Sequence, residues 1–412
     1  MCDVPEAPAD IERDVSANRI AIDSATSVVR YRIIGTSTSG YTCRGKVYGR
    51  LMHEGLTEHD RDKLARARQG FADLWPRERI GDDYTAFIWL IDYWMANEVA
   101  RAEMCADALT RTWAAYWCDD DFETLKTYLY YKFDLEIADD PNANVDENFE
   151  YRGSDFPIAR LNKWNEYLIF NNPNRVLWER TDEMVDFFDI RPGERIADIG
   201  CGGGYFSWQF SKLVGDEGQV FATEINEGAL SYLRDFCDAE GITNIRPLVT
   251  KLNDTGLEEE SVDTIFMCSC YHAVYITDIE FVKDAFLASI HKALTPGGRL
   301  IIVDNAVTEA GVVPYYGPGI RPELIVSQLA YYGFELTGSL QVVPQRFALV
   351  FKEVEGYVPP KVEQVETEQP KGEKRHGAKH LLQILRNGAR GGAPDRRDAG
   401  HEGPEDDHRN DD

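Results

Sequence analysis

At 412 residues, 43% of them apolar and 11% aromatic, the chain is long enough for two domains with sizeable cores. Its 71 acidic and 44 basic residues give a formal net charge of −27, which argues against nucleic acid as a partner because this field repels phosphate backbones. The eight cysteines follow no disulfide or zinc spacing, and apolar runs stay short of the roughly 18 residues of a membrane helix. We therefore expect a cytoplasmic protein with no membrane partner and no metal site.

Residues 1–140 are predicted to form a mainly helical domain. A short strand is expected at 28–34, and helices over 57–135, the first of them capped by Thr57. Apolar and aromatic residues recur at helical spacing between 84 and 118. Such a stripe is more often a core or a dimer interface than a substrate site, so this domain either covers an active site or pairs subunits in a homodimer. The acidic, turn-rich segment 139–144 is the predicted boundary.

After further predicted helices in 156–188, broken by an Asn-Asn-Pro-Asn turn, the segment 195–204 reads R-I-A-D-I-G-C-G-G-G. Its short apolar run predicts a buried strand, and a helical pattern follows it. Glycines at alternate positions let the backbone take unusual φ/ψ angles and let a ligand approach closely. Strand, glycine turn and helix together predict the first half of a βαβ unit.

The acidic residues beside this turn indicate the charge of the ligand. A dinucleotide fingerprint, G-x-G-x-x-G, places a pyrophosphate on a helix N-terminus. The spacing here is G-x-G-x-G, and Asp198 would repel a pyrophosphate but suit a cation or an amino group. Glu224 ends the next predicted strand, where a βαβ site places the carboxylate that binds both ribose hydroxyls. An NAD-dependent oxidoreductase is therefore disfavoured.

The remaining pattern alternates helices and strands. We predict a helix at 228–240, strands at 244–250 and 262–267, a helix at 281–294, a strand at 299–304, a helix from Pro322, and a strand pair at 334–337 and 346–352. The end of strand 262–267 lies at the carboxyl edge of such a sheet, where ligands bind. The long loop 305–321 lies at the same edge, which is typical of functional loops. The charged segment 353–412 is predicted to be a disordered tail.

Three segments together resemble the class I S-adenosylmethionine-dependent methyltransferases over about 175–352. They are D-I-G-C-G-G-G at 198–204 with Glu224, V-D-T-I-F-M at 262–267, and L-T-P-G-G-R-L-I-I-V-D at 294–304, in the order and spacing of that family. The resemblance implies an α/β, Rossmann-like sheet of seven strands with an antiparallel C-terminal edge in a domain at 141–352. It also implies S-adenosyl-L-methionine as cofactor. The alternative is a doubly wound domain whose glycines serve only packing.

The resemblance assigns roles to residues at this edge. The methionine end of the cofactor would lie on Asp198 and the turn, the ribose on Glu224, and the adenine amino group on Asp254 or Asn253, unless N-D-T-G is an ordinary Asx turn. Ser269 stands where the family often has an acid, and Ala273 where a second histidine is frequent, which leaves His272 as the candidate catalytic base. The implied cofactor-binding set is Asp198, Gly200, Cys201, Gly202, Gly204, Glu224, Asn253, Asp254 and Ser269.

Candidate substrate-binding residues are Tyr271, Tyr315 and Arg321, with Tyr316 beside them. Arg321 can equally brace the helix that starts at Pro322. The helix before the first strand often covers the methyl donor in this family, so Tyr167, Phe170 and Trp178 are expected in that cover or in packing.

A small organic molecule is the expected acceptor, methylated on oxygen or carbon. The chain has no N-P-P-Y or D-P-P-Y, which argues against amino methylation of nucleobases and glutamine. Arsenite methylation through Cys201, Cys237, Cys268 and Cys270 is disfavoured, because these positions are typical of strand and helix packing. The alternative function is a binding protein that keeps the pocket and serves as an interaction platform without turnover.

Overall fold

The computed structural model describes residues 21–23, 28–30, 43–78, 83–133, 135, 167–277, 280–315 and 317–357. The predicted boundary at 139–144 and the predicted tail beyond residue 357 lie outside these ranges. Within them, no helix is both long and apolar enough to cross a membrane.

The N-terminal part is helical, as predicted, around a core of aromatic side chains. Trp113, Trp117, Tyr128 and Phe71 are all fully buried there. Its elements are β1 (Ala21–Asp23), β2 (Val28–Arg30), α2 (Cys43–Thr57), α3 (Arg61–Glu78), α4 (Tyr84–Met95), α5 (Glu98–Met104), α6 (Ala108–Trp117), the 3₁₀ turn η2 (Asp120–Phe122) and α7 (Glu123–Lys132).

The predicted start of the first helix was wrong. Thr57 is the last residue of α2, a helix that the sequence analysis did not predict, and its hydroxyl donates to the carbonyl of His53 at 2.8 Å. The next helix begins at Arg61, where the Asp60 carboxylate accepts from the amides of Asp62 and Lys63 at 2.9 and 3.1 Å. The acceptor at this helix start is therefore the carboxylate just before it, three residues beyond the predicted cap.

The C-terminal part contains a seven-stranded sheet in the order β5-β4-β3-β6-β7-β9-β8. All pairs from β5 to β7 are parallel, and β9 pairs antiparallel with both β7 and β8. Its strands are β3 (Arg195–Ile199), β4 (Gln219–Glu224), β5 (Ile245–Val249), β6 (Val262–Cys268), β7 (Leu294–Asn305), β8 (Phe334–Val343) and β9 (Arg346–Glu353). This order, with its switch point beside β3 and its antiparallel end, confirms the predicted class I methyltransferase sheet.

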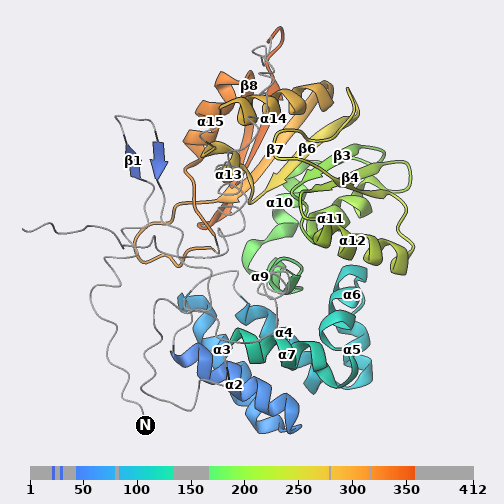
Figure 1. Ribbon diagram of the computed structural model, residues 1–412, viewed down its shortest axis with the longest axis vertical. Helices are drawn as coiled ribbons and strands as arrows, with labels where there is room; N and C mark the ends of the chain where they lie inside the picture. Colours follow the sequence, from blue (N-terminus) through green and yellow to red (C-terminus); the bar gives the residue numbers. More distant parts are fainter. Residues whose placement is uncertain are drawn as a thin grey trace, which may run out of the picture.

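Helices cover both faces of the sheet (Figure 1). Because side chains alternate along a strand, Ile265 and Phe266 of β6 point into two different cores, both fully buried. The helices of this part are α9 (Arg175–Glu179), α10 (Thr181–Phe188), α11 (Tyr205–Val214), α12 (Glu227–Glu240), α13 (Tyr271–Tyr275), α14 (Glu280–Ala293) and α15 (Pro322–Tyr331). One core includes side chains of α10, α11 and α12, and the other includes side chains of α13, α14 and α15.

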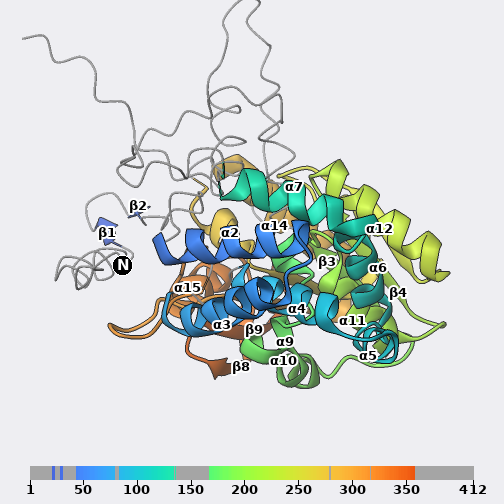
Figure 2. The same ribbon diagram turned by 90° about the horizontal axis from the view of Figure 1, so that it is seen from below.

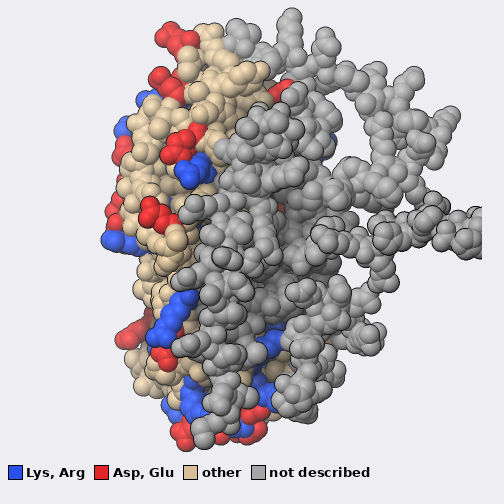
Figure 3. Space-filling model, turned by 90° about the vertical axis from the view of Figure 1, so that its left-hand side faces the viewer, with Lys and Arg blue, Asp and Glu red and all other residues tan. Residues whose placement is uncertain are grey.

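The helical region packs against one end of the sheet domain, with α9 between the two (Figures 1 and 2). Asn172, just before α9, donates to the Thr85 hydroxyl of α4 at 2.6 Å. Trp208 of α11 donates to Asp107 at 2.9 Å. In the face drawn in Figure 3, acidic and basic side chains of the described residues are interspersed. The N-terminal helices are thus joined both to the segment before α9 and to α11, the helix that follows the glycine turn.

Candidate functional site

The glycine turn connects β3 to α11 in a conformation that only glycine adopts easily. Gly200, Gly202 and Gly204 have φ angles of 72°, 54° and 86°. A Cβ at Gly202 would meet no atom within 4 Å, whereas one at Gly204 would lie 2.5 Å from Leu233 of α12. The first position therefore borders open space, and the second serves close packing. Cys201, between Gly200 and Gly202, is half-buried, and burial raises the pKa of its thiol.

Asp198 is buried at the end of β3, next to the turn. Ser207 of α11 donates to its carboxylate at 2.6 Å. Burial raises the pKa of Asp198 to about 7, and the nearby negative charge of Glu224 adds to the rise. A cation placed against the two carboxylates would reverse both effects, so this pair is suited to a positively charged ligand.

Glu224 ends β4 and reaches back to the turn. Its Oε2 accepts from the amide of Gly202 at 3.2 Å, and its Oε1 accepts from the amides of Ile225 and Asn226 at 2.7 and 3.0 Å. These backbone bonds hold the carboxylate beside the turn, with acceptor capacity left for a ligand hydroxyl.

A side chain that the sequence analysis missed covers the other side of the turn. Asn171 donates from Nδ2 to the carbonyl of Gly203 at 2.9 Å, and its Oδ1 is buried without a partner. Of the three residues expected in this cover, Tyr167 instead donates to the Gly228 carbonyl at 2.6 Å, and Trp178 packs on Tyr315 with ring centres 5.0 Å apart. Phe170 accepts from Arg175 through its carbonyl at 2.9 Å.

The two candidates for the adenine amino group lie on the exposed loop after β5. Asp254 accepts from the amide of Gly256 at 2.9 Å, which is the Asx turn that the sequence analysis left open. Asn253 is exposed beside it. Both side chains lie on the loop after β5, whereas His272, the candidate base, lies after β6.

The loop after β6 touches the glycine turn. The thiol of Cys270 donates to the carbonyl of Ile199 at 3.4 Å, and a Cβ on Gly200 would lie 3.3 Å from that sulfur. The next-but-one residue is His272, whose Nδ1 lies 2.9 Å from a carboxylate oxygen of Asp304 at the end of β7. The other Asp304 oxygen accepts from the His272 amide at 2.9 Å. The fold therefore brings the loop before His272 against the turn, and His272 itself onto a buried carboxylate.

Asp304 is fully buried, and its carboxyl group stays ionised. Burial alone would raise its pKa, but the charge and hydrogen bond of His272 outweigh burial and lower the pKa. With a proton on Nδ1 donated to Asp304, His272 keeps Nε2 as an acceptor, and no described residue bonds that atom. This is the arrangement of a histidine base oriented by a carboxylate.

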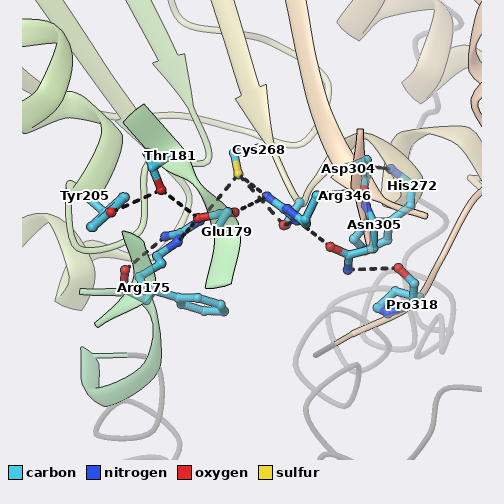
Figure 4. A network of polar contacts seen from close by, with 12 residues as sticks. Arg175, Glu179, Thr181, Tyr205, Cys268, His272, Asp304, Asn305, Pro318 and Arg346 are labelled. Carbon is cyan, nitrogen blue, oxygen red and sulfur yellow. Dashed lines mark hydrogen bonds and ion pairs between the residues drawn. The ribbon is translucent and has the colours of Figure 1, made fainter. Parts of the chain in front are cut away.

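A buried ionic network lies next to this pair (Figure 4). Glu179 of α9 pairs with Arg175 of the same helix and with Arg346 at the start of β9, the latter at 2.8 Å. Both arginines and the glutamate are at least 95% buried. Burial alone would raise the pKa of Glu179, but the two guanidinium groups hold it below its usual value. Arg346 also donates to Ser269 at 2.5 Å, to Asn305, and to the Cys268 sulfur at 2.8 Å.

The remaining candidates are placed differently. Ser269, at a φ of 54°, joins this network instead of standing free at the edge. Tyr271 is fully buried and donates to Gln328 of α15 at 2.8 Å. Tyr315 is buried over Arg346, with the guanidinium carbon 4.6 Å from the ring centre. Arg321 is exposed at the start of α15, and Tyr316 lies outside the described residues.

Sequence reasoning missed Asn171, Arg175, Glu179, Asp304 and Arg346. Asp304 carried a usable signal, because an acidic residue that ends a buried strand is the same pattern that singled out Asp198. The others carried none, since their partners lie on elements far apart in the chain.

Comparison with known proteins identifies this part of the chain. Residues 196–298 match the model of the family described as a methyltransferase domain. This segment of the chain therefore matches a methyltransferase domain. It is 33% identical to the ubiquinone/menaquinone biosynthesis C-methyltransferase UbiE of Vibrio campbellii over 129 residues, which are 31% of this chain and 47% of that protein. The UbiE protein of Haemophilus ducreyi is 27% identical over 200 residues, 48% of this chain and 66% of that protein.

Among solved structures, a SAM-dependent methyltransferase from Aquifex aeolicus matches 44% of this chain and 94% of its own, with 22% identity and a TM-score of 0.40. The chain spans about half the length of the Vibrio relatives that it matches.

The cofactor of this methyltransferase domain is S-adenosyl-L-methionine, and the site fits it. Two carboxylates, Asp198 and Glu224, flank a turn whose Gly202 borders open space, and burial with the charge of Glu224 raises the pKa of Asp198, so a cation held there would favour its ionised form. An amino-acid ammonium and a sulfonium are the positive charges that this cofactor carries.

Proposed function

We propose that this protein transfers a methyl group from S-adenosylmethionine to a small organic acceptor, on carbon or oxygen. The observation that carries the proposal is the pairing of His272 with Asp304 in the loop that touches the glycine turn. A carboxylate-oriented base beside a cation-binding turn serves an acceptor that must lose a proton. Neither a binding protein nor a structural domain needs such a base.

The donor half of the site would be held by the turn and its two acids. Asp198 would hold the cationic end of the cofactor, the open space at Gly202 would admit it, and Glu224, fixed by the Gly202 amide, would accept from the ribose hydroxyls. When bound, the cofactor supplies a methyl group on a sulfonium, a leaving group already activated by its charge. The protein's main contribution is to hold donor and acceptor close and aligned, which can lower a barrier by about 7–11 kcal/mol.

His272 would take the proton of the acceptor on Nε2. Asp304 holds the imidazole ring of His272 through Nδ1, and it holds the backbone of the same residue through the amide. The basic nitrogen, Nε2, therefore needs no reorientation. The imidazolium that forms then lies against an ionised carboxylate, which stabilises it. General base catalysis of this kind contributes about 10²–10⁴-fold in rate.

The relatives support carbon as the methylated atom. The UbiE proteins are named C-methyltransferases of ubiquinone and menaquinone biosynthesis. A carbon acid must lose a proton before it can attack the methyl group, whereas a preformed nucleophile needs no base. This requirement agrees with the His272–Asp304 pair. We therefore favour C-methylation of a small acceptor over O-methylation.

The first experiment is calorimetric titration with S-adenosylhomocysteine and, separately, with NAD. We expect micromolar binding of the first ligand alone, weakened in Glu224→Ala. No binding of S-adenosylhomocysteine to well-folded protein would contradict the proposal.

An acceptor screen with labelled S-adenosylmethionine then tests the base. His272→Ala should lose turnover and keep cofactor affinity, while His59→Ala, an exposed histidine of the helical region, should change neither. Unchanged turnover in His272→Ala would refute the base. Cofactor binding without turnover of any acceptor would favour the binding-protein alternative.

A further inference from the structure

The buried network beside the proposed base has donors that lack acceptors. Three groups are at least 95% buried and have no hydrogen-bond partner: Nε of Arg346, the hydroxyl of Tyr315, and Nε1 of Trp178. They come from β9, from the loop after β7 and from α9. Nε of arginine and Nε1 of tryptophan can only donate, and buried donors left unpaired are costly.

These three groups lie together. The Arg346 guanidinium carbon is 4.6 Å from the Tyr315 ring centre, and the ring centres of Tyr315 and Trp178 are 5.0 Å apart. Arg346 also bonds Asn305, the residue after Asp304, and Asp304 in turn bonds His272, the proposed base (Figure 4). Unpaired donors from three separate segments thus lie in one packed cluster, which Asn305 joins to the carboxylate that orients the proposed base.

The arginine of this cluster also belongs to an ionic network. Arg175 and Arg346 share the buried carboxylate of Glu179, and the Cys268 thiol between them has its pKa raised by burial, which the two arginines only partly offset. The Nε of Arg346 is left over from these contacts. Unpaired donors on and beside a guanidinium group call for a ligand with acceptor oxygens, and an anion makes the stronger hydrogen bond to a guanidinium.

We propose that Trp178, Tyr315 and Arg346 bind a carboxylate of the methyl acceptor. This inference rests on the proposed function, since it names the substrate class of the same site. A carboxylate is ionised at neutral pH, so it can accept from the Arg346 guanidinium in the resting complex, and its two oxygens offer about four acceptor positions for the three donors. A phenol or enol would bring its charge only after deprotonation.

Small carboxylates and their amides test this directly. Acetate and benzoate, and the matched acetamide and benzamide, are titrated by ligand-observed NMR into the protein with and without saturating S-adenosylhomocysteine. We expect the acids to bind at least about tenfold more tightly than the amides, because hydrogen bonds to a charged group are the strong ones. Equal binding of acids and amides in both conditions would overturn the inference.

Two variants remove one donor each and leave the ionic network in place. Tyr315→Phe and Trp178→Phe should each weaken benzoate binding by about tenfold and leave S-adenosylhomocysteine affinity unchanged. Tyr331→Phe, which removes an exposed hydroxyl on α15, is the matched control and should change neither. Unchanged benzoate binding in both donor variants would overturn the inference. So would a loss of S-adenosylhomocysteine affinity instead, because the anion held would then be the cofactor's own carboxylate.

The two proposals fail in different ways. Failure of S-adenosylhomocysteine to bind folded protein contradicts methyl transfer, while a preference for benzoate over benzamide that depends on Tyr315 would still support the anion site. Normal cofactor binding without any preference for the acids contradicts only the anion site.

Discussion

The two halves of the sheet's carboxyl edge differ in their charged groups. At the ends of β3 and β4, Asp198 and Glu224 flank a glycine turn, and burial leaves Asp198 with a pKa of about 7. In the other half, Arg346 at the start of β9 and Arg175 of α9 share the carboxylate of Glu179, and Asp304 at the end of β7 pairs with His272. The first half presents carboxylates alone and the second combines arginines with carboxylates, so the two halves are suited to different ligands.

The halves also differ in how they are assembled. Asp198 and the glycines lie within seven consecutive residues, and Glu224 ends the neighbouring strand. The second half joins residues from α9, β6, β7 and β9, with Glu179 and Arg346 far apart in the chain. A local motif therefore tolerates loss of one member better than the buried ionic network does.

The largest effect is expected from the network. Glu179→Gln leaves two buried guanidinium groups without their counter-ion, and should lower the free energy of unfolding by about 3–5 kcal/mol, measured by urea denaturation. Glu227→Gln, which removes an exposed partner of Arg234, should cost less than about 1 kcal/mol. Equal costs for the two variants would mean that the buried network contributes no more than a surface pair.

Asp198→Asn should separate stability from binding. The pKa of Asp198 is about 7 in the folded protein, against 3.8 in the unfolded chain. The stability that the protonated carboxyl contributes is therefore complete below pH 3.8 and is lost as the pH rises through about 7. At pH 8 the variant should therefore be more stable than the wild type, by about 1–3 kcal/mol, in the absence of ligand.

The same variant should bind cofactor poorly at every pH. In the wild type, affinity for S-adenosylmethionine should rise with pH up to about 7, because the cation needs the ionised carboxylate, and this dependence should vanish in Asp198→Asn. Calorimetry across pH 5–8 checks it. A variant that keeps both affinity and its pH dependence would remove Asp198 from the cation site.

Two glycines provide a matched pair for the turn. Gly202 and Gly193 both have positive φ, 54° and 82°, and a Cβ at either would meet no atom within 4 Å. Substitution by Ala should cost each about 1–2 kcal/mol in stability. Only Gly202→Ala should also lose affinity for S-adenosylhomocysteine, because its Cβ would enter the proposed cofactor space. Equal affinity in both variants would move the cofactor away from the turn.

The smallest effect is expected on the loop after β5. Asp254 is exposed and already accepts from Gly256, so Asp254→Ala should weaken S-adenosylhomocysteine binding by only about two- to tenfold. Asn253→Ala is the comparison on the same loop. A larger loss in Asn253→Ala would assign the adenine contact to the amide.

The glycine turn was predictable, because a buried strand, a turn and a helix each follow from consecutive residues. The seven-stranded sheet with its antiparallel edge was an expectation that came with the family resemblance. The helix start near residue 57 was predicted wrongly, because Thr57 and Asp60 are both plausible caps and α2 had no strong pattern of its own. Asp304 was within reach of sequence reasoning, since it ends a buried strand as Asp198 does.

The sequence by itself determined the cofactor half of this protein. Its alternate glycines and strand-end acids are local, and parallel strands bring their carboxyl ends to one edge whatever else the chain does. Only the tertiary structure decided the other half. It placed Asp304 on His272, joined Arg346 to Glu179, and buried Tyr315 and Trp178 with unpaired donors. The physical reason is that charge balance and hydrogen-bond satisfaction depend on which distant groups meet, and no local pattern specifies this.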